Sequence, residues 1–315
     1  MTPTQLRTFV EVAATGSVRH AAERLFVSPP AVSAALAALQ KDLGVSLVQR
    51  DGRGLVITGP GEVFARYARR VLGLLDEAAV AVTGEVDAAQ GRVRLAAVTT
   101  AGEHVVPRFL ASFRSRYEQA EITLEVGNRA RVWDLLDNHE VDLAIGGRPP
   151  VPGRFRTLAT RPNVLVVVAA PAAGGRRPAS RTTKRRSPRS VSTAELGRRV
   201  WLLREPGSGT RSTVLELLEE LNIFPPKLTL GSNGAIRESV QVGLGITLIS
   251  RDAVARELES GALEEWAIEG GRRPRSWHVV ARAEEDLPPT ARLFLRHLTG
   301  ASGGSNRFQP EPASG

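Results

Sequence analysis

Residues 26–44 have the sequence FVSPPAVSAALAALQKDLG, and this stretch decides how the first part of the chain folds. Ser28 is a favourable helix N-cap, and Pro29 follows at the first helical position, where the missing N–H costs nothing. The helix should end at Gly44. Its apolar side chains keep helical spacing and form one stripe: Val32, Leu36, Leu39 and Leu43. The opposite face carries almost nothing that could do chemistry.

The flanking residues predict a winged helix-turn-helix domain over residues 1–60. Two further helices precede the quoted stretch, and Ser17 is the expected N-cap of the second. Their apolar stripes are Leu6, Phe9, Val10 and Ala13, then Val18, Ala21, Ala22 and Leu25. The segment VSLVQRDGRGLVIT follows and predicts two short strands whose hairpin tip displays Arg50 and Arg53.

A long helix is predicted next, within a linker of residues 61–90. Its apolar positions alternate steps of four and three, as in a coiled coil: Phe64, Ala68, Val71, Leu75, Ala78 and Val82. At about 1.5 Å per residue, residues 61–88 would span roughly 40 Å, which favours a dimerisation helix over a compact connector. The alternative is a helix packed along its own domain.

Residues 91–300 alternate strand and helix patterns, which predicts an α/β module of two similar lobes with a cleft between them. We expect lobe I at about 91–162 and 267–300, and lobe II at about 163–266. Residues 301–315, rich in glycine and serine, predict a disordered tail.

Composition narrows the class of protein. No apolar run approaches the roughly 20 residues that a membrane-spanning helix needs, and the start, MTPTQLRTFVEV, lacks the features of a secretory signal. We therefore expect a cytoplasmic protein. The absence of cysteine excludes disulfides, thiolate catalysis and cysteine-ligated zinc.

The net charge of +9 is concentrated in one place. Residues 171–190 contain no acid and most of the excess cations: Arg176, Arg177, Arg181, Lys184, Arg185, Arg186 and Arg189. An exposed, disordered loop is the favoured interpretation of this basic segment, and a second nucleic-acid contact is the alternative.

The order and spacing of these segments resemble the LysR-type transcriptional regulators. QLRTFVEVAATGSVRHAAERLFVSPPAVSAALAALQKDLGVSLVQRDGRGLVITGPG is similar to their DNA-binding domain. RVRLAAVTTAGEHVVPRFLASFRSRY and EVGNRARVWDLLDNHEVDLAIGGRPP are similar to their effector-binding domain, most of all in regulators of carbon fixation and sulfur assimilation. The resemblance implies a fold of mixed class, α+β and α/β. It would consist of a winged helix-turn-helix, a linker helix and a two-lobed effector domain resembling periplasmic binding proteins.

The resemblance also implies that the helix of the opening stretch enters the DNA major groove. Its outer face and the wing then give the expected DNA-binding residues: Ser28, Pro29, Pro30, Ser33, Ala34, Ala37, Arg50 and Arg53. The family usually has glutamine at the position of Pro29 and often arginine after Ser33. Because this chain has proline and alanine there, we expect recognition to depend on backbone contacts and DNA shape more than on bidentate base contacts.

Effector-binding residues are expected where strands end at the cleft. Thr99 and Thr100 stand between a strand and a helix, where free N–H groups favour an anion, although Thr100 and Glu103 could instead form a capping box. The segment REPGSGTRS is either a glycine-rich binding loop or a helix-capping loop. The expected set is Thr99, Thr100, Gly147, Arg148, Glu205, Ser208, Thr210 and Asn233.

The histidines, His20, His104, His139, His278 and His297, show neither metal-ligand spacing nor an acid–base cluster. We therefore expect no catalysis, no metal and no cofactor. The expected partners are double-stranded DNA, a second copy in a homodimer, a homotetramer built from two dimers, RNA polymerase and a small anionic metabolite. Two alternatives remain at this stage: an enzyme acting on a phosphorylated substrate, and a small-acid binding module with no regulatory role.

Overall fold

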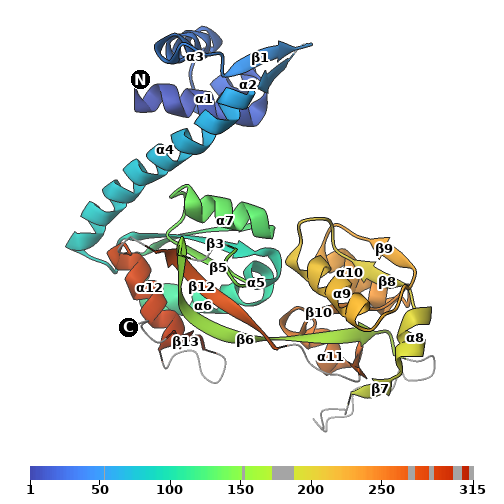
Figure 1. The fold of residues 1–315 in the computed structure, drawn as a ribbon. Helices are drawn as coiled ribbons and strands as arrows, with labels where there is room; N and C mark the ends of the chain where they lie inside the picture. The colour runs from blue at the N-terminus through green and yellow to red at the C-terminus, as the bar shows by residue number, and fades with distance from the viewer. Residues whose placement is uncertain are drawn as a thin grey trace.

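The computed structural model describes residues 1–52, 54–150, 153–171, 188–268, 274–283, 287–300 and 307–311. A small domain stands at one end, a long helix descends from it, and two lobes lie side by side at the other end (Figure 1). None of the described helices is both long and apolar enough to cross a bilayer.

The first domain is the predicted winged helix-turn-helix. Its elements are α1 (Pro3–Thr15), α2 (Val18–Leu25), α3 (Pro29–Leu43), β1 (Val48–Asp51) and β2 (Gly54–Ile57). Ser17 and Ser28 cap α2 and α3 as expected, and Gly44 ends α3 in the left-handed conformation that glycine adopts without strain. The three apolar stripes meet around Phe9 and Leu39, which are completely buried.

Helix α4 (Gly59–Val86) begins in this domain and leaves it. Ala65 and Ala68 are buried in the core of the first domain, and Phe64 contacts Phe9 with ring centroids 5.3 Å apart. The predicted coiled-coil seam is therefore wrong in its first half, because Phe64 and Ala68 face inward. The exposed apolar stripe is displaced around the helix and comprises Val63, Tyr67, Val71, Leu74, Leu75 and Val82.

The far half of α4 is joined to the effector domain by a buried polar cluster. The carboxylate of Glu77 accepts a hydrogen bond from Nη2 of Arg282 at 2.6 Å and lies 3.0 Å from Nδ1 of His139. A Cβ atom added to Gly73 would stand 2.2 Å from the carbonyl oxygen of Asn138. Glycine therefore allows the helix to approach lobe I closely.

The effector domain has two lobes that share strand β6 (Phe155–Ala169). Lobe I also contains β3 (Arg92–Val98), α5 (Thr99–His104), α6 (Val106–Arg116), β4 (Glu121–Gly127), α7 (Arg129–Asp137), β5 (Leu143–Gly146), β12 (Pro274–Arg282), α12 (Pro289–Thr299) and β13 (Gln309–Pro310). Lobe II also contains β7 (Arg189–Val191), α8 (Thr193–Arg198), β8 (Trp201–Leu203), α9 (Gly209–Glu220), β9 (Lys227–Thr229), α10 (Asn233–Gln241), β10 (Thr247–Ser250), η1 (Arg251–Ala253), α11 (Ala255–Ser260) and β11 (Glu264–Ile268).

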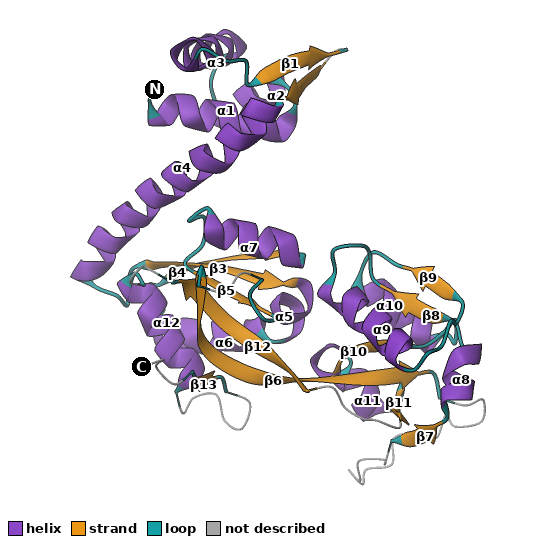
Figure 2. Ribbon diagram, in the orientation of Figure 1, coloured by secondary structure: helices purple, strands orange, loops and turns teal. Residues whose placement is uncertain are grey.

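The sheet order is β4-β3-β5-β12-β6-β11-β7, with β10 and β13 also paired to β6 (Figure 2). The first part of β6 pairs with β12 in lobe I, and its last part pairs with β10 and β11 in lobe II. Within the described part of the effector domain, each buried apolar cluster stays within one lobe. The predicted two-lobed α/β arrangement is confirmed, with β6 as the continuous element between the lobes.

Two other expectations about the chain have different outcomes. The predicted disordered tail is wrong for residues 307–311, because Phe308 is completely buried against Phe109 and β13 pairs with Thr160 and Ala159. Burial of a large aromatic ring outweighs the flexible composition of the segment. Most of the basic segment, residues 172–187, lies outside the described residues.

Replacing Gly73 with alanine should force α4 away from lobe I. Overpacking of this kind costs about 1–3 kcal/mol, more than the roughly 1 kcal/mol that alanine adds to a helix. We expect G73A to lower the melting temperature of the full chain. G59A is the matched control on the same helix, because a Cβ there meets nothing within 4 Å. Equal melting temperatures for G73A and G59A would contradict this packing.

Candidate functional site

The outer face of α3 is exposed, as the sequence predicted. Ser28, Pro29, Pro30, Ser33, Ala34 and Ala37 are all exposed to solvent. The Ser28 side chain accepts a hydrogen bond from the backbone N–H of Ala31 at 3.4 Å, so its hydroxyl proton stays available for a phosphate. The face has little polar chemistry beyond the two serine hydroxyls, which agrees with the expectation of few bidentate base contacts.

The wing lies beside α3. Strands β1 and β2 pair with Arg50 opposite Leu55, and the Arg50 side chain is exposed. The backbone N–H of Leu55 donates to the carbonyl oxygen of Gly16 at 2.8 Å, which ties the wing to the end of α1. Arg53, the other predicted wing residue, lies outside the described residues.

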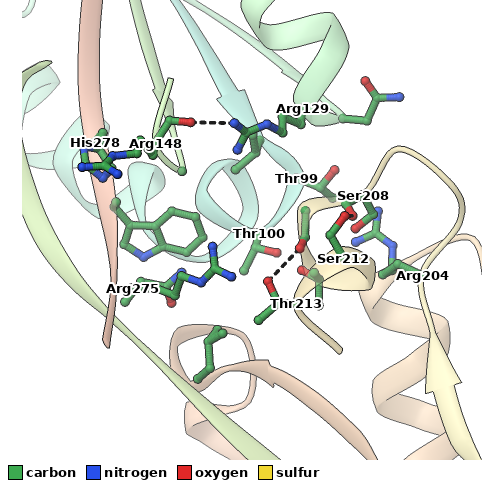
Figure 3. A pocket seen from close by; sticks show the side chains of 18 of the residues that line it. Thr99, Thr100, Arg129, Arg148, Arg204, Ser208, Ser212, Thr213, Arg275 and His278 are labelled. Carbon is green, nitrogen blue, oxygen red and sulfur yellow. Dashed lines mark hydrogen bonds between the residues drawn. The ribbon is translucent and has the colours of Figure 1, made fainter. Parts of the chain in front are cut away.

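The second candidate site is a cleft of about 790 Å³ between the two lobes (Figure 3). Its walls come from the ends of β3, β4 and β5 and from β12 on one side, and from the start of α9 on the other. Seven of the eight predicted effector residues line it: Thr99, Thr100, Gly147, Arg148, Glu205, Ser208 and Thr210. The rule that ligands sit beyond the carboxyl ends of strands therefore located the cleft.

Asn233, the eighth predicted residue, lies behind the wall of the cleft. It is only 2% exposed and belongs to a buried hydrogen-bonded chain that joins the lobes. Its Nδ2 donates to Oγ1 of Thr100 at 2.8 Å, and its Oδ1 accepts from Nη1 of Arg204 at 2.6 Å. Asn233 therefore positions Thr100 and Arg204.

The capping box of Thr100 and Glu103, which was the alternative to a ligand role, does not form, since α5 has no side-chain cap. Thr100 instead accepts the hydrogen bond from Asn233, and Thr99 Oγ1 donates to the carbonyl oxygen of Gly127 at 3.2 Å. Both threonines are thus fixed by long-range partners at the edge of the cleft.

Arg204 and Glu205 form a paired charge at the lobe II wall. Nε and Nη2 of Arg204 donate to the two carboxylate oxygens of Glu205 at 2.7 and 2.8 Å. These hydrogen bonds hold the pKa of Glu205 below its ordinary value, although burial opposes the effect. Glu205 is therefore ionised at neutral pH, and its charge is compensated by Arg204.

The cations on the lobe I wall are not compensated in this way. Arg129, at the start of α7, donates from Nη2 to the carbonyl oxygen of Arg148 at 2.7 Å. Within the described parts of the chain, neither Arg129 nor Arg148 forms an ion pair with a carboxylate. Burial lowers the pKa of Arg129, and the positive charge of Arg275 lowers it further. This wall therefore concentrates positive charge that an anion would neutralise.

His278 and Arg275 reach the same cleft from β12. Arg275 donates to Glu216 of α9 at 2.7 Å, which places an ion pair across the cleft between the lobes. Burial lowers the pKa of His278, Glu311 opposes that effect, and the charge of Arg148 adds to it. His278 is accordingly neutral at pH 7 and offers a hydrogen bond rather than a charge.

The sequence reasoning missed Arg129, Arg275 and His278. Arg129 had a usable signal, because it begins the helix that follows β4, as Thr99 begins the helix that follows β3. Arg275 and His278 lie on an antiparallel strand that returns from lobe II, and their register was not visible in the sequence.

Two family models match this chain. A model described as "Bacterial regulatory helix-turn-helix protein, lysR family" matches residues 3–62, and one described as "LysR substrate binding domain" matches residues 87–302.

Similar proteins agree with these matches. The chain is 34% identical over 327 residues to the HTH-type transcriptional regulator CbbR of Xanthobacter flavus, covering 99% of this chain and 94% of that protein. It is 31% identical over 291 residues to the RuBisCO operon transcriptional regulator of Allochromatium vinosum, covering 92% and 93%. These relatives are transcriptional regulators and not enzymes, so the alternative of an enzyme is rejected.

One solved structure is informative for the cleft. The regulatory domain of CcmR from Synechocystis PCC6803, in complex with 2-PG, has 28% identity and a TM-score of 0.59. The match covers 68% of this chain and 98% of that one.

Replacement of Thr100 by valine keeps the side-chain shape and removes the acceptor for Asn233. An unsatisfied buried amide costs about 1–3 kcal/mol, so urea unfolding of T100V should start at lower denaturant concentration. The matched control is T210V, since the Thr210 hydroxyl has no hydrogen bond in the described structure. The double variant T100V/N233A should lose less free energy of unfolding than the two single variants lose together, because both changes remove the same hydrogen bond. Strict additivity would argue against this coupling.

Proposed function

The chain belongs to the LysR family of bacterial transcriptional regulators, and we propose that a small anion bound in the cleft controls how it binds DNA. The main support for this proposal comes from Arg129 and Arg148 on the lobe I wall. Neither arginine has a carboxylate partner among the described residues.

The backbone around these arginines favours the same kind of ligand. Helix α7 begins at Arg129 and helix α9 begins at Gly209, and both N-terminal ends contribute lining residues, Asn128 and Ser208 among them. Helix N-termini carry free N–H groups and a partial positive charge, which attract anions. Hydroxyl groups from Thr100, whose oxygen accepts from Asn233 and whose proton is free in the described structure, and from Thr210 add neutral hydrogen-bond donors on the two sides of the cleft. An anion with several oxygen acceptors therefore suits this site.

The chemistry of the effector is proposed from the cleft and from one relative. CcmR, at 28% identity, is named as binding 2-PG through its regulatory domain. We take 2-PG as the first probe for this chain, followed by other phosphorylated metabolites, sulfate and small carboxylates. The remaining alternative is a module that binds a small acid without regulatory effect. Such a module would bind the probe, but neither its affinity for DNA nor the bending of the DNA would change.

We also propose a homodimer formed through α4. The stripe of exposed apolar side chains on this helix runs from Val63 to Val82 and includes Tyr67 at 61% exposure and Leu74 at 52%. Burying such a stripe against its copy removes apolar surface from water. A symmetric pair of α3 helices would then bind the two halves of an interrupted palindrome. Tetramer formation, contact with RNA polymerase and a cytoplasmic location extend the same proposal.

The effector proposal is tested with R129A in the full chain. A charge-assisted hydrogen bond contributes about 1.5–3 kcal/mol, so R129A should weaken 2-PG binding by at least about tenfold in calorimetry. R198A is the matched control, because Arg198 is exposed on α8 and lies outside the cleft. Footprinting of promoter DNA should change with 2-PG for the wild type and the control, and not for R129A. Absence of any anion effect on the wild-type footprint would end the proposal.

The dimer proposal is tested with L74E. A glutamate in the middle of the apolar stripe places like charges opposite each other, so the variant should sediment as a monomer and lose affinity for a palindrome. V242E, at a side chain that is 82% exposed on lobe II, is the control and should remain dimeric. A wild-type chain that sediments as a monomer at working concentration would contradict the proposal, as would an L74E dimer.

A further inference from the structure

The most exposed large apolar side chain in the described part of the chain is Phe26, at 95% exposure. It occupies the turn between α2 and α3, immediately before the exposed end of α3. An aromatic ring placed in water loses the stabilisation that burial would give it. No described contact within the fold accounts for a phenylalanine at this position.

The backbone conformation of Phe26 is also unusual for a phenylalanine. Phe26 has φ 55°, in the left-handed region, where glycine and asparagine are accommodated and bulky side chains are strained. Its N–H donates to the carbonyl oxygens of Ala22 and Glu23, and the N–H of Val27 also donates to Ala22. These bonds fix the backbone of the turn, so the side chain of Phe26 is directed away from the domain core. In the free protein, Phe26 therefore combines an unfavourable exposed ring with a strained backbone conformation.

Phe26 is continuous with the DNA-binding face. Val27 beside it is 47% exposed, and the exposed residues Ser28, Pro29 and Pro30 follow directly. This end of the molecule lies far from the effector lobes (Figure 1). The face of α3 itself offers mainly small apolar groups, Ala34 and Ala37, beside Ser33. An apolar anchor at its entrance would supply contact area that α3 lacks.

We propose that Phe26 is a DNA-contacting residue that packs its ring on an apolar group of the half-site bound by α3. This inference rests on the proposed docking of α3 in the major groove. The thymine methyl group is the apolar feature that the major groove presents to side chains, and the deoxyribose of the adjoining backbone is the second apolar surface within reach. Burial in the complex offsets the strain and exposure that the free protein carries.

The test compares F26N with F224N in the full chain. Phe224 is 85% exposed on lobe II, so its replacement removes an equivalent ring from a different surface. Asparagine is tolerated in the left-handed region, so F26N should melt at the same temperature as the wild type or higher. Its affinity for the promoter half-sites should nevertheless fall about tenfold, while F224N binds as the wild type does.

Replacing thymine by deoxyuridine in the half-site identifies the group contacted. If deoxyuridine weakens the wild type and leaves F26N unaffected, the ring packs on a thymine methyl. If F26N is weaker on both DNAs by the same factor, the ring packs on deoxyribose, and the contact stands.

Other outcomes overturn the inference. If F26N binds the half-sites with the affinity of the wild type, Phe26 does not contact DNA, and the proposed docking of α3 is unaffected. A change of sedimentation in F26N shows that a second copy of the chain covers the ring instead. Failure of the wild type to protect any promoter palindrome removes the docking of α3 and the contact together.

Discussion

One strand, β6, belongs to the sheets of both lobes, and the geometry of the effector cleft depends on it. Its pairing with β12 in lobe I continues directly into its pairing with β10 and β11 in lobe II. Buried polar contacts reinforce the junction: Arg161 pairs with Asp252 at 2.7 Å, and Ser250 donates to Asn163 at 2.7 Å. Because Arg161 lies where β6 pairs with β12 and Asp252 belongs to lobe II, their buried ion pair helps to fix the spacing of the cleft walls.

Local signals in the sequence were sufficient for the first domain and for the outline of the second. Caps at Ser17 and Ser28 and helical periodicity act over a few residues, so they predict α1 to α3 correctly. Seven of the eight residues that were predicted from the ends of strands line the cleft. The same reasoning fails where a distant residue decides the outcome. Asn233 lies behind the cleft wall, where it donates a hydrogen bond to Thr100, and Phe109 gives Phe308 a buried site in a segment of flexible composition.

Helix α4 shows how a correct periodicity can give the wrong face. The four-and-three pattern indicated one seam, but the helix has two apolar sides in its first half. One side, with Ala65 and Ala68, completes the core of the first domain. The other, with Tyr67 and Val71, remains exposed. The sequence pattern alone does not show which of the two apolar sides of α4 is buried within its own chain, because that depends on how α4 packs against α1.

The cluster around Glu77 joins the effector domain to the helix that leads to the first domain and its helix α3. Glu77 is held by Arg282 and lies beside His139, so this part of α4 is fixed to lobe I. From Glu77 back to Gly59 the helix is about 27 Å long, at about 1.5 Å per residue. A rotation of about 5° at the cluster therefore moves the first domain by about 2 Å. Since hydrogen bonds to DNA operate within a range of about 0.5 Å, such a rotation is enough to break or restore the contacts of one half-site.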